Sequence, residues 1–191
     1  MSKTVVNITF QDGREYEGEI VNDSPQGIGT MRFANNDVYE GEWNFGCMHG
    51  KGTYRFYDPN TDRFAGSYCG QFVNNKFEGV GTRIYADKII YKGSWQNNMR
   101  TGNGAIWFTN GSYFYGIWKF DKMIRGIFHL ASGDIYDGEM SNDKFEGFGK
   151  YFWNEDNSFF EGIFKEGKPY NGIKIFPNGN IIKYTNGNSH L

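Results

Sequence analysis

The sequence predicts an all-β fold, namely an elongated single-layer antiparallel sheet made of consecutive hairpins without helices. Three observations carry this prediction. A glycine-centred motif recurs seven times, large apolar residues stand at alternate positions inside each copy, and asparagine-rich pairs separate the two halves of a copy. Alternation with a period of two is typical of strands, and no helical period runs through the chain.

The first strand of each copy is centred on one glycine. These central glycines, spaced by 22 to 29 residues, are Gly18, Gly41, Gly70, Gly93, Gly116, Gly138 and Gly162. Two positions before them stand the aromatic residues Tyr16, Tyr39, Tyr68, Tyr91, Phe114, Tyr136 and Phe160. Two positions after them stand Ile20, Trp43, Phe72, Trp95, Trp118, Met140 and Phe164. Offsets of two place both side chains and the glycine on one face of a strand, which we call the ring face.

The second strand of each copy begins with a glycine pair and continues with alternating apolar residues. The pairs are Gly27/Gly29, Gly50/Gly52, Gly79/Gly81, Gly102/Gly104 and Gly147/Gly149, whereas two shorter copies keep only Gly126 or Gly172. Residues such as Asn74-Asn75 and Asn97-Asn98 separate the two strands, and they tolerate the positive φ of tight turns. Each copy is therefore predicted to be one hairpin.

The glycines are predicted to leave space in which the aromatic rings can pack. A residue without a Cβ leaves a hollow in the sheet, and we expect an aromatic ring from the neighbouring strand to fill it.

The residue pattern of the repeat resembles that of a known family. Tyr39-Glu40-Gly41-Glu42-Trp43 followed by His49-Gly50-Lys51-Gly52 is similar to the membrane occupation and recognition nexus (MORN) repeat, and seven copies cover about residues 14 to 176. The resemblance is to the repeats-only type, and it implies successive antiparallel hairpins without helices.

The repeat pattern predicts one array over residues 1–184. Half-repeats at 4–13 and 177–184 flank the seven copies, and a six-residue insertion near 58–63 extends the hairpin tip of one copy. Tyr184 stands where a glycine is expected, which suggests that the array ends there. Residues 185–191 are predicted to form a frayed tail.

Composition argues against several classes of function. The formal net charge is -2, from 20 Lys+Arg and 22 Asp+Glu, so a nucleic-acid partner is not expected. No stretch has the apolar length of a signal peptide or a membrane span, which predicts a cytoplasmic protein. Cys47 and Cys69 lack metal-ligand spacing and are expected to be reduced thiols.

No residue cluster predicts catalysis, a cofactor or a metal. The insertion begins like a calcium loop at Asp58, but Arg63 and Cys69 stand where such a loop needs glycine and glutamate. His49 is the turn histidine of the MORN pattern. The recurring carboxylates alternate with the rings and are expected to be solvated, so we expect no enzyme.

Two classes of function then remain. The first is a non-catalytic scaffold or adaptor that binds another protein, and the resemblance to MORN-only proteins implies a cytoskeletal or ciliary assembly such as an axoneme. The second is a phospholipid-binding module of a membrane surface. Basic residues are scattered among acids along the chain, which disfavours the lipid alternative without removing it.

A candidate partner site follows from the positions that alternate with the rings, on what we call the second face. In the first two repeats this face is polar, whereas later repeats place apolar groups there, predicted to bind a partner helix or strand, or a second copy through the C-terminal repeats. These candidates are Trp107, Tyr115, Ile117, Ile127, Phe152, Ile163, Ile173 and Ile175. The C-terminal segment folding back over them is the local alternative.

A rival docking groove is predicted on the ring face. It would be lined by six aromatic residues, namely Phe33, Phe56, Tyr85, Phe108, Trp153 and Phe176.

Overall fold

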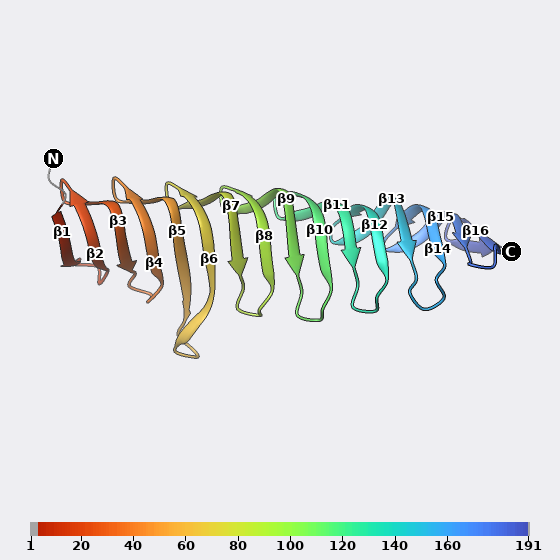
Figure 1. Ribbon diagram of the computed structural model, residues 1–191, viewed down its shortest axis with the longest axis horizontal. Helices are drawn as coiled ribbons and strands as arrows, with labels where there is room; N and C mark the ends of the chain where they lie inside the picture. The colour runs from red at the N-terminus through yellow and green to blue at the C-terminus, as the bar shows by residue number, and fades with distance from the viewer. Residues whose placement is uncertain (1–3, 191) are drawn as a thin grey trace. The chain divides into compact units, whose positions relative to one another are not determined.

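The computed structural model describes residues 4–190, and these residues form seventeen β-strands and no helix (Figure 1). The strands are β1 (Thr4–Thr9), β2 (Glu15–Val21), β3 (Ser24–Arg32), β4 (Val38–Asn44), β5 (Cys47–Asp58), β6 (Arg63–Val73), β7 (Lys76–Ile84), β8 (Ile90–Gln96), β9 (Met99–Trp107), β10 (Tyr113–Lys119), β11 (Lys122–His129), β12 (Ile135–Ser141), β13 (Lys144–Phe152), β14 (Phe159–Lys165), β15 (Lys168–Ile175), β16 (Ile181–Thr185) and β17 (Asn188–His190). The predicted all-β class of consecutive antiparallel hairpins is confirmed.

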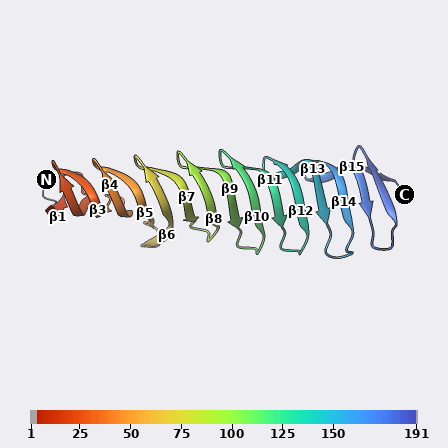
Figure 2. The same cartoon turned by 45° about the horizontal axis from the view of Figure 1, so that its top comes forward.

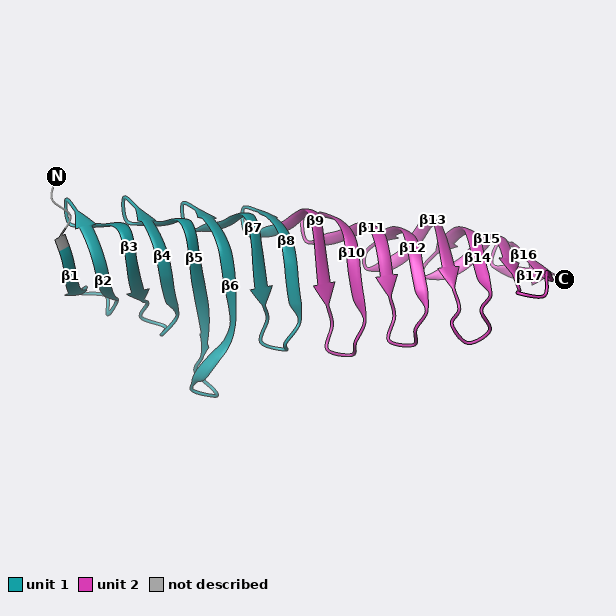
Figure 3. Cartoon of the chain, viewed as in Figure 1, with its two compact units in different colours: residues 1–99 teal, residues 100–191 magenta. Residues whose placement is uncertain are grey.

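The chain divides into two compact units, Met1–Met99 and Arg100–Leu191 (Figure 3). Strands β1 to β8 belong to unit 1, and β9 to β17 belong to unit 2 apart from Met99, the first residue of β9. Inside each unit every strand pairs antiparallel with its neighbours in the chain. No helix able to cross a membrane occurs in the described part of the chain.

Each unit has two unlike edges. Two-residue turns close one edge, and longer loops close the other (Figure 1). The short turns use the predicted positive φ, for example 47° at Asn74 and 67° at Asn75. Strands β5 and β6 are the longest of the described strands, and their connecting loop holds the insertion.

The predicted ring residues form the core. Every aromatic residue two positions before a central glycine is at most 2% exposed: Tyr16, Tyr39, Tyr68, Tyr91, Phe114, Tyr136 and Phe160. Of the residues two positions after it, all but the half-buried Ile20 are buried as well. The rings meet edge to face, as between Tyr39 and Trp43 at 5.0 Å, an arrangement that aromatic pairs prefer.

The glycine hollows exist, but one ring fills two of them. A Cβ built on Gly52 would lie 2.4 Å from the Tyr39 hydroxyl, and a Cβ on Gly41 would lie 2.6 Å from the same oxygen. The ring therefore covers the glycine of its own strand as well as that of the neighbouring strand, whereas the sequence predicted only the neighbour. The Tyr39 hydroxyl donates to the Glu42 carbonyl at 2.8 Å, which satisfies this buried group.

The tryptophans connect successive hairpins. The Nε1 atoms of Trp43, Trp95 and Trp118 donate to the carbonyls of Gly29, Gly81 and Gly104 at 3.0, 3.2 and 3.1 Å. Each bond joins residues 14 positions apart, so it fixes a repeat to the strand before it.

The end of the array differs from the middle. Tyr184 pairs with Gly172, and its ring contacts Phe160 edge to face at 5.4 Å, so here a tyrosine faces a hollow. The sequence predicted a frayed tail from residue 185, but the structure places Asn188–His190 in β17, paired with β16. The turn between them uses Asn186 and Gly187 at positive φ, and Leu191 lies outside the described residues.

Candidate functional site

The eight candidate residues of the second face lie on unit 2, and all eight lie on the side opposite the buried rings. In β10 the burial alternates strictly, with Phe114, Gly116 and Trp118 buried and Tyr115 and Ile117 exposed. Tyr115 pairs with Ile127 of β11, so these two side chains are direct cross-strand neighbours. Trp107, Tyr115, Ile117, Ile127, Ile163 and Ile173 are each 36–59% exposed, whereas Phe152 and Ile175 are half-buried.

The strand register reveals a row that sequence reasoning had only partly found. Eight residues on strands β9 to β16 follow one another in cross-strand pairs: Trp107, Tyr113, His129, Ile135, Phe152, Phe159, Ile175 and Ile181. We call this the apolar row. Only three of its members, Trp107, Phe152 and Ile175, were predicted, because the adjacency of all eight depends on cross-strand register and not on alternation within a strand.

Contacts within the apolar row are close. The rings of Tyr113 and His129 are stacked, with 4.3 Å between their centroids. Trp107, Phe159 and Ile181 remain 42%, 39% and 53% exposed. Since no second layer covers them in the described chain, these three side chains form part of an exposed apolar surface.

Charges divide the rest of the second face. In the next pairing row Asp137, Lys150 and Glu161 stand between Ile127 and Ile173. Lys150 and Glu161 form an ion pair at 3.1 Å. These charges separate two apolar groups of the second face, a first one around Ile127 and a second one around Ile173. The apolar row runs beside the charges and connects the two groups. Phe148, 48% exposed beside Ile163, belongs to the second group and was missed because it lies between the glycines of a pair.

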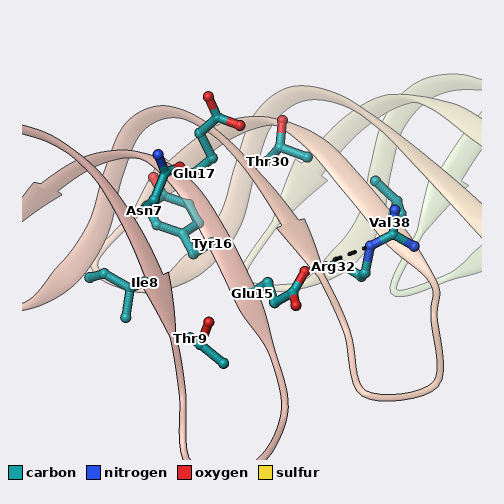
Figure 4. Close-up of a pocket in the computed structure, with 9 residues that line it drawn as sticks. All are labelled: Asn7, Ile8, Thr9, Glu15, Tyr16, Glu17, Thr30, Arg32 and Val38. Carbon is teal, nitrogen blue, oxygen red and sulfur yellow. Dashed lines mark ion pairs between the residues drawn. The ribbon is translucent and has the colours of Figure 1, made fainter.

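The second face of unit 1 has another character. Its corresponding pairing row reads Thr9, Glu15, Arg32, Val38, Arg55, Ser67, Ile84 and Ile90. A hollow of ≈ 350 Å³ lies on this face at β1 to β4, with Glu15 4.0 Å from Arg32 across it (Figure 4). The figure labels mostly threonine, asparagine and charged side chains around it. This mixed polar surface agrees with the expectation of a solvated face.

Cationic side chains of the chain itself already cover part of the rival groove on the ring face. Phe33, Phe56, Tyr85, Phe108, Trp153 and Phe176 are all half-buried. The Arg83 guanidinium lies 3.5 Å from the centre of the Phe56 ring and 5.1 Å from that of Tyr85. The Lys174 ammonium lies 4.0 Å from the Trp153 ring. Cation–π contacts of this kind use the ring faces internally, so the groove offers less free aromatic surface than the second face does.

Polar groups elsewhere form loop contacts. Asp58 accepts the Asn60 N–H at 2.9 Å and the Thr61 hydroxyl at 3.0 Å, which stabilises the tip of the β5–β6 hairpin. Across residues 4–190, no group of three or more His, Cys, Asp or Glu side chains has an arrangement that could hold a metal ion. Cys47 and Cys69 are free thiols.

One loop carboxylate is strongly perturbed. Asp156 accepts the Ser158 hydroxyl, the Ser158 N–H at 2.9 Å and the Lys174 ammonium at 3.1 Å. These hydrogen bonds, that of the hydroxyl first, lower the pKa of Asp156 to about 2. The charged carboxylate therefore stabilises the folded state above the ordinary carboxyl pKa, and this contribution is lost as the pH falls through the folded pKa.

We expect Asp156→Asn to weaken the acid sensitivity of the protein. Between about pH 4 and pH 2 the wild-type melting temperature should fall more steeply than that of the variant, and the two curves should converge at the acid end. Thermal melts followed by circular dichroism across this range measure the effect. Asp143→Asn, which removes a carboxylate from an exposed turn, is the control for the loss of one surface charge; identical slopes for wild type and Asp156→Asn would contradict the assignment.

The fold and the surface together define an open β-repeat protein, in which regular hairpins present one ring-filled face and one face free for contact. The sequence model of the MORN repeat matches residues 16–38, 39–58, 68–88, 91–113 and 136–158, which is more than half of the chain. The chain therefore belongs to the MORN repeat family. Of the seven copies of the repeat, the two that are unmatched, near 114–135 and 160–176, are those that keep a single glycine in the second strand.

Similar proteins were found by sequence and by structure. Alsin of Rattus norvegicus is 28% identical over 156 residues, which is 78% of this chain and 9% of alsin. MORN repeat-containing protein 3 of Xenopus laevis is 38% identical over 78 residues, 40% of this chain and 33% of that protein. The chain thus spans a third or less of these relatives.

Among solved structures, the SAS-4 (dCPAP) TCP domain of Drosophila melanogaster, in complex with a proline-rich motif of Ana2 (dSTIL), aligns over 96% of this chain and 90% of that domain. It has 16% identity and a TM-score of 0.40.

Proposed function

We propose that this protein is a non-catalytic scaffold that binds another protein through the second face of unit 2. The observation that supports the proposal is the apolar row, which runs across eight successive strands without a lysine, arginine, aspartate or glutamate side chain. Exposed apolar surface of this continuity usually marks an interface. Membership of a repeat family built of stacked hairpins agrees with a binding role, since such arrays present extended surfaces.

The proposed partner is a helix or a strand laid across the sheet. Eight strands at about 4.8 Å spacing give the apolar row a length of about 34 Å, which matches a helix of about 22 residues at 1.5 Å per residue. A second copy of this chain, paired through the same C-terminal repeats, is the other protein that the surface would suit. The resemblance to MORN-only proteins supports a further proposal, that the scaffold serves a cytoskeletal or ciliary assembly.

The test is a double substitution at exposed positions of this face. Trp107→Ser with Ile117→Lys should abolish partner binding or self-association, because it removes two exposed apolar groups and adds a charge. The melting temperature should change little, since the two side chains are 42% and 49% exposed. Tagged protein identifies the partner from a lysate, and titration of the purified partner then gives the change in Kd. Sedimentation reports self-association.

The matched control changes the same face outside the site. Ile28→Ser with Val80→Lys alters two apolar residues of unit 1 that are 59% and 62% exposed, and binding should persist. If the Trp107/Ile117 variant bound as wild type does, the interface would have to move to the ring-face groove. If it failed to fold, the apolar row would be core and not surface.

A further inference from the structure

The three two-residue turns of unit 2 between β10 and β15 carry an excess of positive charge. With their flanking residues they read Lys119-Phe120-Asp121-Lys122, Ser141-Asn142-Asp143-Lys144 and Lys165-Glu166-Gly167-Lys168. These twelve residues contain five lysines and three acids, in a chain whose net charge is -2. We call this edge the lysine edge; the short turns of the chain are at the top of Figure 2.

The opposite edge of unit 2 has the reverse charge. Its loops, residues 108–112, 130–134, 153–158 and 176–180, contain three acids and no lysine or arginine. The short turns of unit 1, at residues 21–24, 44–47, 73–76 and 96–99, contain one acid and one lysine. The excess of lysine thus belongs to one edge of one unit and is no general property of the repeat.

Internal contacts engage two of the three acids of the lysine edge but only one of its five lysines, Lys144, in an ion pair, while the Lys122 ammonium donates to the Asn142 side chain at 3.3 Å. Asp121 accepts the Arg100 Nε at 2.9 Å, and Glu166 contacts the Lys144 ammonium. Lys119, Lys165 and Lys168 are exposed and form no ion pair within 4.0 Å in the part of the chain that the structure describes, although the Lys165 ammonium lies 5.1 Å from the centre of the Tyr170 ring and its charge acts on Glu166.

Two pairs of these lysines are also held directly opposite each other, where their charges repel. Lys119 pairs directly with Lys122 across the β10–β11 ladder, and Lys165 pairs with Lys168 across the β14–β15 ladder. Like charges directly opposite each other destabilise a hairpin. An anionic partner would relieve both repulsions.

A second and independent feature of the same edge is Phe120. This residue adopts φ 49° at the first turn position and is 59% exposed, whereas five of the other short turns have asparagine in that place with φ 47–51°. A bulky side chain in the left-handed region is uncommon and strained. Its ring gains little burial in exchange, and the Lys119 ammonium lies 5.9 Å from its centre. An apolar group held in this position can contact a ligand bound by the neighbouring lysines.

One turn of unit 1 offers a natural comparison. Phe45 has the same place in the turn between β4 and β5, with φ 46° and 80% exposure, but no lysine flanks it. Phe120 is therefore distinguished by its combination with the lysines and not by the aromatic turn residue alone.

We propose that the lysine edge binds an acidic polypeptide segment that also carries apolar side chains, with Phe120 contacting the apolar ones. The outer lysine pairs are four strands apart, about 19 Å, which an extended chain at about 3.3 Å per residue spans with about six residues. A flat anionic bilayer suits the edge less well, because an acidic residue (Asp121, Asp143 or Glu166) occupies each of the three turn tips and would meet the lipid phosphates. A peptide can pass beside these tips and reach the flanking lysines.

Fluorescence anisotropy with labelled peptides tests the proposal. An oligoglutamate of about ten residues is the first probe, and a peptide of equal length and charge density with interspersed leucines is the second. Lys119→Gln, Lys165→Gln and Lys168→Gln together should weaken binding of both probes about tenfold at low salt, because three exposed charge pairs are lost. Binding of the wild type should fall steeply between about 50 mM and 500 mM salt.

Further variants separate the features of the edge. Lys51→Gln, Lys88→Gln and Lys92→Gln in unit 1 remove the same charge from other exposed positions, and the affinity should change less than about twofold. Phe120→Asn should remove any preference for the leucine-containing peptide while leaving oligoglutamate binding intact, since asparagine suits the turn. Phe45→Asn is its matched control and should keep that preference. Circular dichroism checks that each variant is folded.

Three results would overturn the proposal. Equal weakening by both triple variants would show general charge attraction, and no weakening by either would show that the lysine edge is not the site. If the peptides did not bind, but vesicles of phosphatidylserine and phosphatidylcholine bound the wild type and bound the edge variant more weakly, the edge would be assigned to a lipid surface. The Trp107→Ser, Ile117→Lys variant should bind the peptides normally, so this proposal can hold or fail independently of the proposed scaffold function.

Discussion

Gly52→Ala is expected to destabilise the protein by about 3 kcal/mol or more, although it adds a single methyl group. The new Cβ would lie 2.4 Å from the Tyr39 hydroxyl oxygen and 2.5 Å from its Cε2 atom, distances that real Cβ atoms essentially never show. Tyr39 is 0% exposed and its hydroxyl donates to the Glu42 carbonyl, so the ring cannot move aside without losing a buried hydrogen bond. Overpacking a close-packed core costs about 1–3 kcal/mol, occasionally more.

Urea unfolding followed by circular dichroism measures this effect. Gly111→Asn is the control, because Gly111 has φ +89° in a turn, a Cβ added there would have nothing within 4 Å, and asparagine tolerates that region. We expect that variant to change the stability by less than about 1 kcal/mol. Combining Gly52→Ala with Tyr39→Leu should cost less than the sum of the two changes, because the shorter side chain vacates the hollow. Strict additivity, or a Gly52→Ala protein as stable as wild type, would refute the ring-in-hollow arrangement.

Trp95→Ala is expected to cost about 3–5 kcal/mol, which is the usual range for removing a buried tryptophan. Trp95 is 4% exposed and contacts Tyr68, Phe77 and Tyr91 edge to face at 5.4, 5.6 and 5.1 Å. Its removal leaves a cavity between rings of adjacent hairpins and abolishes the bond to the Gly81 carbonyl.

Trp95→Phe separates the two contributions. The phenyl ring retains part of the packing but cannot donate a hydrogen bond, so this variant should lose less than the alanine variant, with about 1 kcal/mol assigned to the bond. The shift in urea midpoint is the measurement for both variants. Nearly equal shifts would show that the hydrogen bond, not the packing, dominates at this position.

The sequence predicted the core better than it predicted the surface row, for a geometric reason. Tyr16, Tyr39 and Phe160 were assigned to the buried face from offsets of two residues, and strand alternation is a local property of the backbone. Tyr113, His129 and Phe159 were missed as members of the apolar row. Their adjacency depends on which residues pair across strands, and the bulges between Ile117 and Trp118 and between Ile163 and Phe164 shift that pairing.

The lysine edge could not be predicted from the sequence for a related reason. Lys119, Lys122, Lys144, Lys165 and Lys168 are spread over 50 residues and look scattered among acids along the chain. Successive hairpins return the chain to the same edge after two strands, so turns that are about 23 residues apart in the sequence come to lie along one border of unit 2. The lysines are thus dispersed along the chain but gathered along this edge.

The repeat, the absence of helical periodicity and the identity of the buried rings could all be predicted from the order of residues, because spacing within a single strand or hairpin decides these features. Three other features became visible only in the folded chain: Tyr39 fills the hollows of both Gly41 and Gly52, Arg83 and Lys174 cover part of the rival groove, and the eight residues of the apolar row are cross-strand neighbours. These features depend on side-chain direction and cross-strand register, and neither is fixed by the order of residues within one strand.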